Sequence, residues 1–370
     1  MCYGGRFLTL GTELPVGWEP ERTVKISMRI LEKPDQTDTK TIITKGKWRI
    51  EIKEYRELVL GDKYSFVGRV ETESWAGKTI KIEMVDPEVS KLERGKLRVS
   101  EWVILKVAEV RERMVGNLAR WLPEPEASLA AGILLGVRRR MPWEFYQDLI
   151  KTGTVHIVAA SGYNVTIVAR VVMVPLLRIL GRAWAIPAGI GAIVLYTIVA
   201  GGSAAVVRAA IMASLTLLAY YWGRATEARR LLWLTAGVML FVNPLMIVDV
   251  GFQLSVAATA GLLYVEPWIR RLILRKKEKE SWLQRYLAEY LTPTLAANIT
   301  TLPIILLTFG RISWFSPIVN MFVLPLTPLI MFLSGVAVAG GMVSFPLGRM
   351  LALILYAPLW IMVRVIKGFG

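Results

Sequence analysis

The chain has 370 residues, of which 54% are hydrophobic and 20% are charged, and its net charge is +16. A mean hydropathy of +0.46 is too high for an ordinary soluble protein, yet the charges are too many for a chain that lies in a membrane throughout. The single cysteine, Cys2, excludes a disulfide framework and a cysteine-based zinc site, and the single histidine, His156, excludes hydrolytic metal centres of the HxHxDH or HExxH kind.

A small β domain is predicted after the N-terminal segment 1–20. Four segments of residues 21–98 alternate apolar and polar side chains as half-buried strands do: TVKISMRILEKPD, TKTIITKGKWRIEIK, DKYSFVGRVETE and KTIKIEMVD. The turn-forming pairs Pro34-Asp35, Gly61-Asp62 and Ala76-Gly77 separate them. Four or five strands in this length predict a small antiparallel barrel or sandwich. An OB-like barrel is the first choice because it closes a core of this size with few strands.

Aromatic and basic side chains of this domain suit a single-stranded nucleic acid, because bases stack on aromatic rings and cations neutralise phosphates. The candidates are Trp48, Arg49, Lys53, Tyr55, Tyr64 and Trp75. The commoner alternative is that alternating Lys and Glu residues form only a solvated sheet face.

A connecting amphipathic helix is predicted over 99–126, ending at Pro123 and Pro125, and long apolar runs then dominate 127–370. Because roughly twenty apolar residues cross a bilayer, about eight spanning helices are expected. They are 154–177, 184–201, 204–222, 231–248, 251–269, 293–309, 316–340 and 345–364. The run 127–137 is too short to span, which predicts an interfacial or re-entrant helix. The predicted fold is a polytopic α-helical membrane protein with an N-terminal small β-barrel (OB-like) domain.

Charge distribution predicts the topology. Residues 127–370 hold twenty-two Lys or Arg against eight Asp or Glu. The bases gather after the first, third and fifth predicted spans, at Arg178 and Arg182, GRATEARR and RRLILRKKEKE, which the positive-inside rule assigns to the cytoplasm. The β domain of this cytoplasmic-membrane protein is then extracellular or periplasmic. Since no signal peptide or spanning helix precedes it, a truncated N-terminus is expected, with an inverted topology as the alternative.

The segment GTVHIVAASGYNVTIVAR places polar groups inside the first predicted span. On one continuous helix Ser161 lies about 140° from His156, and Asn164 lies between them, so the three share one broad face. An unsatisfied polar group in hydrocarbon costs several kcal/mol, so this face must contact protein or water. Either the residues line a path, or they hydrogen-bond other helices while Gly162 permits close packing.

Arg208 lies inside a predicted span, where a guanidinium costs at least about 2.5 kcal/mol. It needs an acid, carbonyl groups or a wet cavity, and Asp249 is the nearest candidate acid in the sequence, with Gln253 extending the same polar patch. Asn298 and Asn320 bring amides into two later spans. Prolines interrupt these spans, as often happens where backbone lines a cavity: Pro303, Pro325 and Pro328. Polar groups in so many spans indicate a pathway rather than an anchor.

Four ordered segments resemble the ComEC competence-protein family, the inner-membrane DNA-uptake channels. They are GILLGVRRRMPWEFYQDLIKTGTVHIVAASGYNV, VVRAAIMASL, NPLMIVDVGFQLSVAATAGL and ITTLPIILLTFGRISWFSPIVNMFVLPL. The resemblance covers most of residues 21–350. Each segment alone is weak, but the combination in this order is specific.

The resemblance implies that the β domain handles DNA and that 127–370 is a competence-type transmembrane domain that conducts one strand into the cytoplasm. The matching motif positions are His156, Ser161, Gly162, Arg208, Asp249, Gln253 and Asn320. Many members carry a second histidine where this chain has Asn164, so a proton-linked or metal-linked histidine pair is not expected. Many members also carry a metallo-β-lactamase-like domain, which the single histidine of this chain excludes. The N-terminal spanning helices that are usual in the family are not expected here either, in agreement with a truncated N-terminus.

The leading hypothesis is a non-enzymatic channel for single-stranded DNA in natural transformation, with no cofactor and no metal. No GxxxxGK[ST] motif occurs, so the resemblance implies a separate nuclease and a cytoplasmic ATPase motor as partners, beside the DNA strand and the lipid bilayer. The alternative is a small-solute or ion transporter with a regulatory soluble domain, in which Arg208 and Asp249 form the gating or substrate pair. A membrane hydrolase using Ser161 with His156 is least favoured, because the two lie far apart on an ideal helix and no acid flanks them.

Overall fold

The computed structural model divides into two compact units, Met1–Glu112 and Arg113–Gly370, which are taken separately. It describes residues 7–9, 23–30, 34–37, 40–45, 48–54, 58–59, 61–75, 78–92, 99–138, 141–158, 161–223, 227–273, 281–310 and 312–370.

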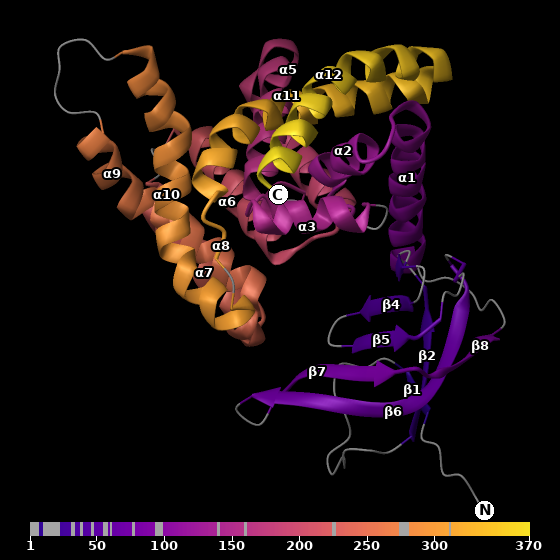
Figure 1. The fold of residues 1–370 in the computed structure, drawn as a ribbon. Helices are drawn as coiled ribbons and strands as arrows, with labels where there is room; N and C mark the ends of the chain where they lie inside the picture. The colour runs from indigo at the N-terminus through magenta and orange to yellow at the C-terminus, as the bar shows by residue number, and fades with distance from the viewer. Residues whose placement is uncertain are drawn as a thin grey trace, which may run out of the picture. The chain divides into compact units, whose positions relative to one another are not determined.

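The N-terminal unit is built on a single sheet, in which the long strand β6 curves across the others (Figure 1). The strands are β1 Phe7–Thr9, β2 Thr23–Arg29, β3 Asp35–Thr37, β4 Lys40–Lys45, β5 Trp48–Ile52, β6 Lys63–Trp75, β7 Lys78–Val85 and β8 Glu88–Leu92. Their order is β1-β2-β6-β7-β5-β4-β3, and β8 pairs with β6. In the described residues the sheet is an open half-barrel with β1 and β3 at its ends. The pairs β1–β2 and β5–β7 are parallel, so the wholly antiparallel prediction is wrong there.

The alternation along these strands builds the core of the sheet. Ile26 and Met28 of β2, Ile50 of β5 and Phe66 of β6 point to one face and are at most 2% exposed. The predicted turn at Gly61-Asp62 is confirmed, because Gly61 has a φ of 88°, which glycine adopts without strain. Pro34 directly precedes β3, and Ala76-Gly77 lies outside the described residues.

The rest of the chain is helical (Figure 1). The helices are α1 Val99–Trp121, α2 Glu126–Leu135, α3 Trp143–Lys151, α4 Val155–Val158, α5 Gly162–Val199, α6 Ala204–Tyr221, α7 Ala228–Val242, the 3-10 helix η1 Pro244–Val248, α8 Val250–Ala260, the π-helix η2 Gly261–Val265, α9 Glu266–Ile273, α10 Trp282–Phe309, α11 Ser316–Val343 and α12 Phe345–Phe369. The predicted connecting helix corresponds to α1, which ends at Trp121, two residues before Pro123.

Five helices of the described chain are long and apolar enough to cross a membrane, not the predicted eight. They are α5, α6, residues Gln284–Phe309 of α10, α11 and α12. The predicted spans 154–177 and 184–201 fall largely within α5, which Gly181 interrupts with a non-helical φ of 68° and ψ of 169°. The predicted spans 231–248 and 251–269 are instead runs of short helices, because Asn243-Pro244 ends α7 and Asp249 starts α8 as its N-cap.

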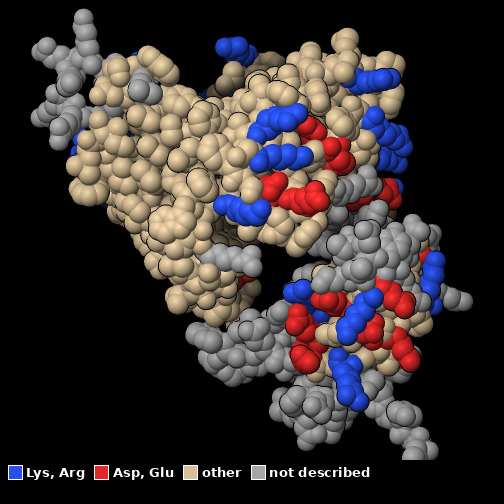
Figure 2. Space-filling model, in the orientation of Figure 1, with Lys and Arg blue, Asp and Glu red and all other residues tan. Residues whose placement is uncertain are grey.

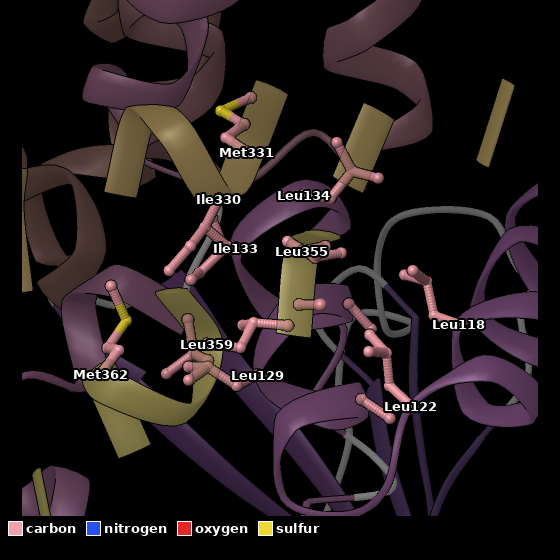
Figure 3. Packing of buried hydrophobic residues seen from close by; sticks show 14 of the residues in the cluster. Leu118, Leu122, Leu129, Ile133, Leu134, Ile330, Met331, Leu355, Leu359 and Met362 are labelled. Atoms are coloured by element: carbon pink, nitrogen blue, oxygen red, sulfur yellow. The ribbon is translucent and has the colours of Figure 1, made fainter. Parts of the chain in front are cut away.

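Helix α2 occupies the core of the helical unit. All ten of its residues are buried against the rest of the unit, and the interfacial or re-entrant placement given for 127–137 stays a prediction. Figure 3 shows its side chains Leu129, Ile133 and Leu134 among residues of α11 and α12, including Ile330 and Leu359.

On the face shown in Figure 2, the charged residues of the helical unit gather near α3, whereas α7 and α10 present mostly uncharged surface. Many apolar side chains there are exposed, including Phe241 at 90% and Leu307 at 90%. A soluble protein rarely exposes apolar surface on this scale, so this surface fits a membrane protein.

Candidate functional site

The polar motif of the first predicted span lies at a break between two helices. Helix α4 ends at Val158, and α5 begins at Gly162 with Ser161 as its extended N-cap residue, at φ −120° and ψ 168°. The single continuous helix predicted through His156, Ser161 and Asn164 is therefore wrong. Serine is favoured at the N-cap position. The pair Ser161-Gly162 therefore indicated the start of a helix, but the apolar residues around it favoured one continuous span.

Asn164 joins α5 to the buried end of α2. Its side chain is 1% exposed, and its Nδ2 donates to the Ile133 carbonyl at 2.9 Å. Its Oδ1 accepts from Ser161 Oγ at 3.3 Å. Tyr196, which the sequence did not single out, donates to the next carbonyl, Leu134, also at 3.3 Å. Because the last carbonyls of a helix have no partner within it, these two side chains complete the hydrogen bonding of α2.

His156 is bonded to the turn that precedes it. Its Nδ1 lies 3.0 Å from the Gly153 carbonyl oxygen, and since a carbonyl only accepts, Nδ1 carries the hydrogen. Gly153 has a φ of 70° and ends α3. A Cβ added there would lie 2.8 Å from Ser316 Cβ, so this turn abuts the start of α11.

The two predicted amides of the later spans meet at Ser316. Asn320 Nδ2 donates to Ser316 Oγ at 3.3 Å, and Asn298 Nδ2 lies 3.5 Å from the same oxygen. Asn320 is 2% exposed, and its Oδ1 has no hydrogen-bond partner among the described residues. The Gly153 turn thus connects the His156 motif with this amide cluster. Ser316 was missed because one serine before a proline also suits an ordinary helix start.

Arg208 is buried where α5, α6 and α8 meet. It is 6% exposed. Its Nη1 donates to Thr259 Oγ1 of α8 and lies 3.8 Å from the sulfur of Met212. Its Nε has no partner in the described part of the chain. A Cβ added at Gly162 would lie 3.2 Å from Nη2, so the missing side chain of Gly162 makes room for the guanidinium.

Asp249 and Gln253 do not join this site by any described contact. Asp249 is exposed and accepts from the Phe252 N–H at 2.7 Å as the N-cap of α8. Gln253 Nε2 donates to the Ile247 carbonyl at 2.7 Å. No ion pair links Asp249 to Arg208 among the described residues, so the predicted acid partner of Arg208 is wrong. Both side chains support the local path of the backbone.

The candidate nucleic-acid residues of the sheet have mixed outcomes. Tyr64, a candidate for stacking on bases, is only 6% exposed, and its hydroxyl accepts from the Val59 N–H at 3.1 Å. Arg49 is ion-paired with Glu83 at 3.3 Å and with Glu51. Lys53 is exposed. Trp48 and Trp75 lie in β5 and β6 with side chains outside the described part, and Tyr55 lies outside it altogether.

The helical site has the means to attract an anion, and its Ser161 and His156 do not form a nucleophile–base pair in the described residues. The start of a helix and a guanidinium are both electropositive. Ser161 Oγ donates to Asn164 and His156 Nδ1 to Gly153, and no bond joins Ser161 to His156 in the described residues. The side chains that would have to act together as nucleophile and base are engaged elsewhere.

Comparison with known proteins places the helical unit in a family. A family model described as "Competence protein" matches residues 133–369. The chain is 24% identical over 221 residues to "ComE operon protein 3" of Bacillus subtilis (strain 168), covering 60% of this chain and 27% of that protein. It is 27% identical over 205 residues to "Competence protein ComA" of Neisseria gonorrhoeae, covering 50% of this chain and 27% of that protein.

The chain thus spans about a quarter of the length of these curated relatives. No solved structure matches it. The family model covers more than half of the chain, including α4, α5 and the buried Arg208, and the chain belongs to the competence-protein family.

Proposed function

We propose that this protein conducts single-stranded DNA across the cytoplasmic membrane during natural transformation. The family supports a role in DNA uptake. Five helices suited to a membrane supply the scaffold. The observation that carries the proposal is Arg208, a guanidinium buried among apolar helices without an acid partner in the described residues. Such a cation suits a polyanionic substrate and is costly for a mere anchor.

The site also suits the energetics of a moving strand. Phosphates must be attracted strongly enough to enter and weakly enough to leave. One guanidinium surrounded by neutral hydroxyl and amide groups meets this demand, since a cluster of cations in an apolar interior would hold the strand. Residues 127–370 hold more basic than acidic side chains, which supports the entry of a polyanionic strand. Part of this basic excess lies in the predicted cytoplasmic loops.

The sheet of the first unit contributes DNA binding in this proposal, as an OB-like domain on the outer face of the membrane. Its open curvature, its out-of-order strands and the parallel β5–β7 pair fit a partly open Greek-key barrel. The described candidates on it are Arg49 and Lys53, while Trp48, Tyr55 and Trp75 remain predictions. Tyr64 is no longer one of them because it is buried.

The chain acts in this proposal without chemistry of its own, beside a separate nuclease and a cytoplasmic ATPase. His156 belongs to the path through its contact with the Gly153 turn. Replacing His156 by alanine is expected to impair DNA transport and to leave any nuclease step unchanged. The alternative of a small-solute or ion transporter loses its main support, because Arg208 and Asp249 do not form the required pair.

Binding of DNA by the purified full chain in detergent tests the proposal. A fluorescent single-stranded oligonucleotide is expected to bind, and the logarithm of its affinity should fall steeply and linearly with the logarithm of salt concentration. The same chain in vesicles should not carry small ions or dyes. Absent or salt-independent binding together with a steady ion flux would contradict a DNA channel and favour the transporter.

A further inference from the structure

The start of α5 has backbone donors that nothing in the described chain uses. The first backbone hydrogen bond of the helix runs from the Val165 N–H to the Ser161 carbonyl, at 3.4 Å. The N–H groups of Gly162, Tyr163 and Asn164 precede it and find no acceptor among the described residues, and the Ser161 side chain does not cap them. They form the electropositive end of the first part of α5, which runs from Gly162 to the break at Gly181.

The guanidinium of Arg208 has a free edge, and one atom of this edge lies beside the start of α5. Nη1 is occupied by Thr259, whereas Nε is buried without a partner and Nη2 makes no hydrogen bond in the described part of the chain. Nη2 is the atom that lies 3.2 Å from the position a Gly162 Cβ would take. In a planar guanidinium, Nε–H and one Nη2–H point in the same direction and form the fork that binds two oxygens of one anion.

These two positive groups repel each other unless an anion lies between them. The side chain of Arg208 is 6% exposed, so water screens it little. No carboxylate is paired with it among the described residues, and Asp249 is bound to the start of α8 instead. Leaving a charge buried without its counterion costs several kcal/mol, and a bound anion removes most of this cost.

We propose that the fork of Arg208 and the N-terminus of α5 form a binding site for a single phosphodiester group. A phosphodiester has one negative charge and two free oxygens, which match the fork, and helix N-termini bind phosphate through the same free N–H groups. Under the proposed function, on which the identity of the donor rests, the phosphodiester belongs to the DNA strand. Gly162 gives the group access, and the Cβ of Ala209 also lies 3.2 Å from the Gly162 Cβ position, so a larger side chain at 162 would be crowded.

Thermal unfolding of the full chain in a phosphate-free maltoside detergent tests the site without DNA. Dimethyl phosphate, with sodium chloride at matched ionic strength as the control, is expected to raise the Tm of the natural protein with increasing concentration. Gly162→Ala keeps every charge and a helical backbone but places a Cβ against Nη2, so it should weaken the effect about tenfold or more. Arg208→Gln should abolish it.

Two control variants match these changes. Gly191→Ala lies in the same helix with no atom within 4 Å of its added Cβ, and Arg349→Gln removes an exposed charge from α12; both should respond to dimethyl phosphate like the natural protein. If Arg208→Gln fails to fold, the comparison of Gly162→Ala with Gly191→Ala decides alone. Equal stabilisation of those two glycine variants, or no stabilisation of the natural protein, overturns the site.

The source of the phosphodiester is tested with oligonucleotides. Single-stranded DNA should bind more weakly when its linkages are neutral methylphosphonates, and Arg208→Gln should lower the slope of log affinity against log salt by about one. If dimethyl phosphate stabilises the protein but DNA does not bind, the site stands and the proposed function fails. If Arg208 instead governs retention of a phospholipid, measured by native mass spectrometry, the phosphodiester is that of a lipid headgroup.

Discussion

At the scale of single residues, Asn164 illustrates how a polar side chain inside an apolar helix can serve the fold. Its amide nitrogen binds Ile133 of α2 at 2.9 Å, and its amide oxygen accepts from Ser161. The sequence predicted that this position hydrogen-bonds rather than titrates, but it did not identify the partner, because the partner is a backbone carbonyl 31 residues away. Such a partner leaves no mark in side-chain composition.

Replacing Asn164 by leucine is expected to destabilise the helical unit by about 1–3 kcal/mol, because the buried Ile133 carbonyl loses its donor. Thr166→Val is the matched control two residues further along α5, since its hydroxyl donates to the Gly162 carbonyl at an exposed position. The control should change stability by less than about 0.5 kcal/mol. Chemical unfolding in detergent measures both. Equal stability of the two variants would show that the α2 contact is dispensable.

At the scale of elements, helix ends decide where this structure departs from the hydropathy pattern. The helix breaks at 158–162 and at Gly181 lie within apolar sequence. A hydropathy average over a window of roughly twenty residues therefore does not detect them. The ends were readable as local signals: Gly153 after α3, the pair Ser161-Gly162 before α5, and Asn243-Pro244 after α7. The helices that pack closely together could not be predicted from the sequence, because a glycine within a helix does not indicate which other element packs against it.

The break within α5 depends on Gly181. Its φ of 68° and ψ of 169° lie in a region that only glycine adopts readily, and nothing lies within 4 Å of an added Cβ. Gly181→Ala should therefore destabilise the protein by about 1–3 kcal/mol through backbone strain alone. Gly191→Ala, at a helical position with open space, should be neutral or stabilising by up to about 1 kcal/mol. The difference in Tm between these two variants measures the strain, and equal Tm values would contradict it.

The contact of α11 with α12 depends on glycines beneath Trp121. A Cβ at Gly341 would lie 2.0 Å from the indole ring, and one at Gly348 would lie 2.6 Å from the Gly341 Cα. Gly341→Ala is expected to cost about 1–3 kcal/mol by overpacking. Gly335→Ala on the same helix meets only Leu134, at 4.0 Å, and should be tolerated. Thermal unfolding of the pair distinguishes close packing from a general effect of glycine in α11, which would lower both alike.

At the scale of the whole molecule, composition was enough to predict a membrane protein with a separate sheet domain. The number of spans and the strand pairing were not predictable in the same way. The parallel pair β5–β7 joins strands separated by all of β6, and such pairing follows from how the chain closes its core rather than from local pattern. The buried site likewise assembles residues from α5, α6 and α8. Gly162 and Arg208 were visible in the sequence, whereas Thr259 of α8 was not.

The outward orientation of the sheet domain is a prediction for labelling. In a Cys2→Ser background, Glu54→Cys on the sheet domain and Arg178→Cys on α5 both introduce an exposed thiol. An impermeant maleimide should label Glu54→Cys in intact cells and Arg178→Cys only after permeabilisation, because basic segments stay in the cytoplasm. The reverse pattern would invert the topology.

The central claim is that a DNA strand passes through the helical unit beside Arg208. The most direct measurement places the full chain in vesicles, with a fluorescent, 5′-biotinylated single-stranded oligonucleotide outside. Streptavidin inside the vesicles captures the 5′ ends that enter, and added nuclease then degrades the oligonucleotide that remains outside. The account predicts protected oligonucleotide with the natural protein and with Gly191→Ala, and at least about tenfold less with Gly162→Ala and Arg208→Gln. Equal protection in all four proteins, or protection no greater than in empty vesicles, would contradict it.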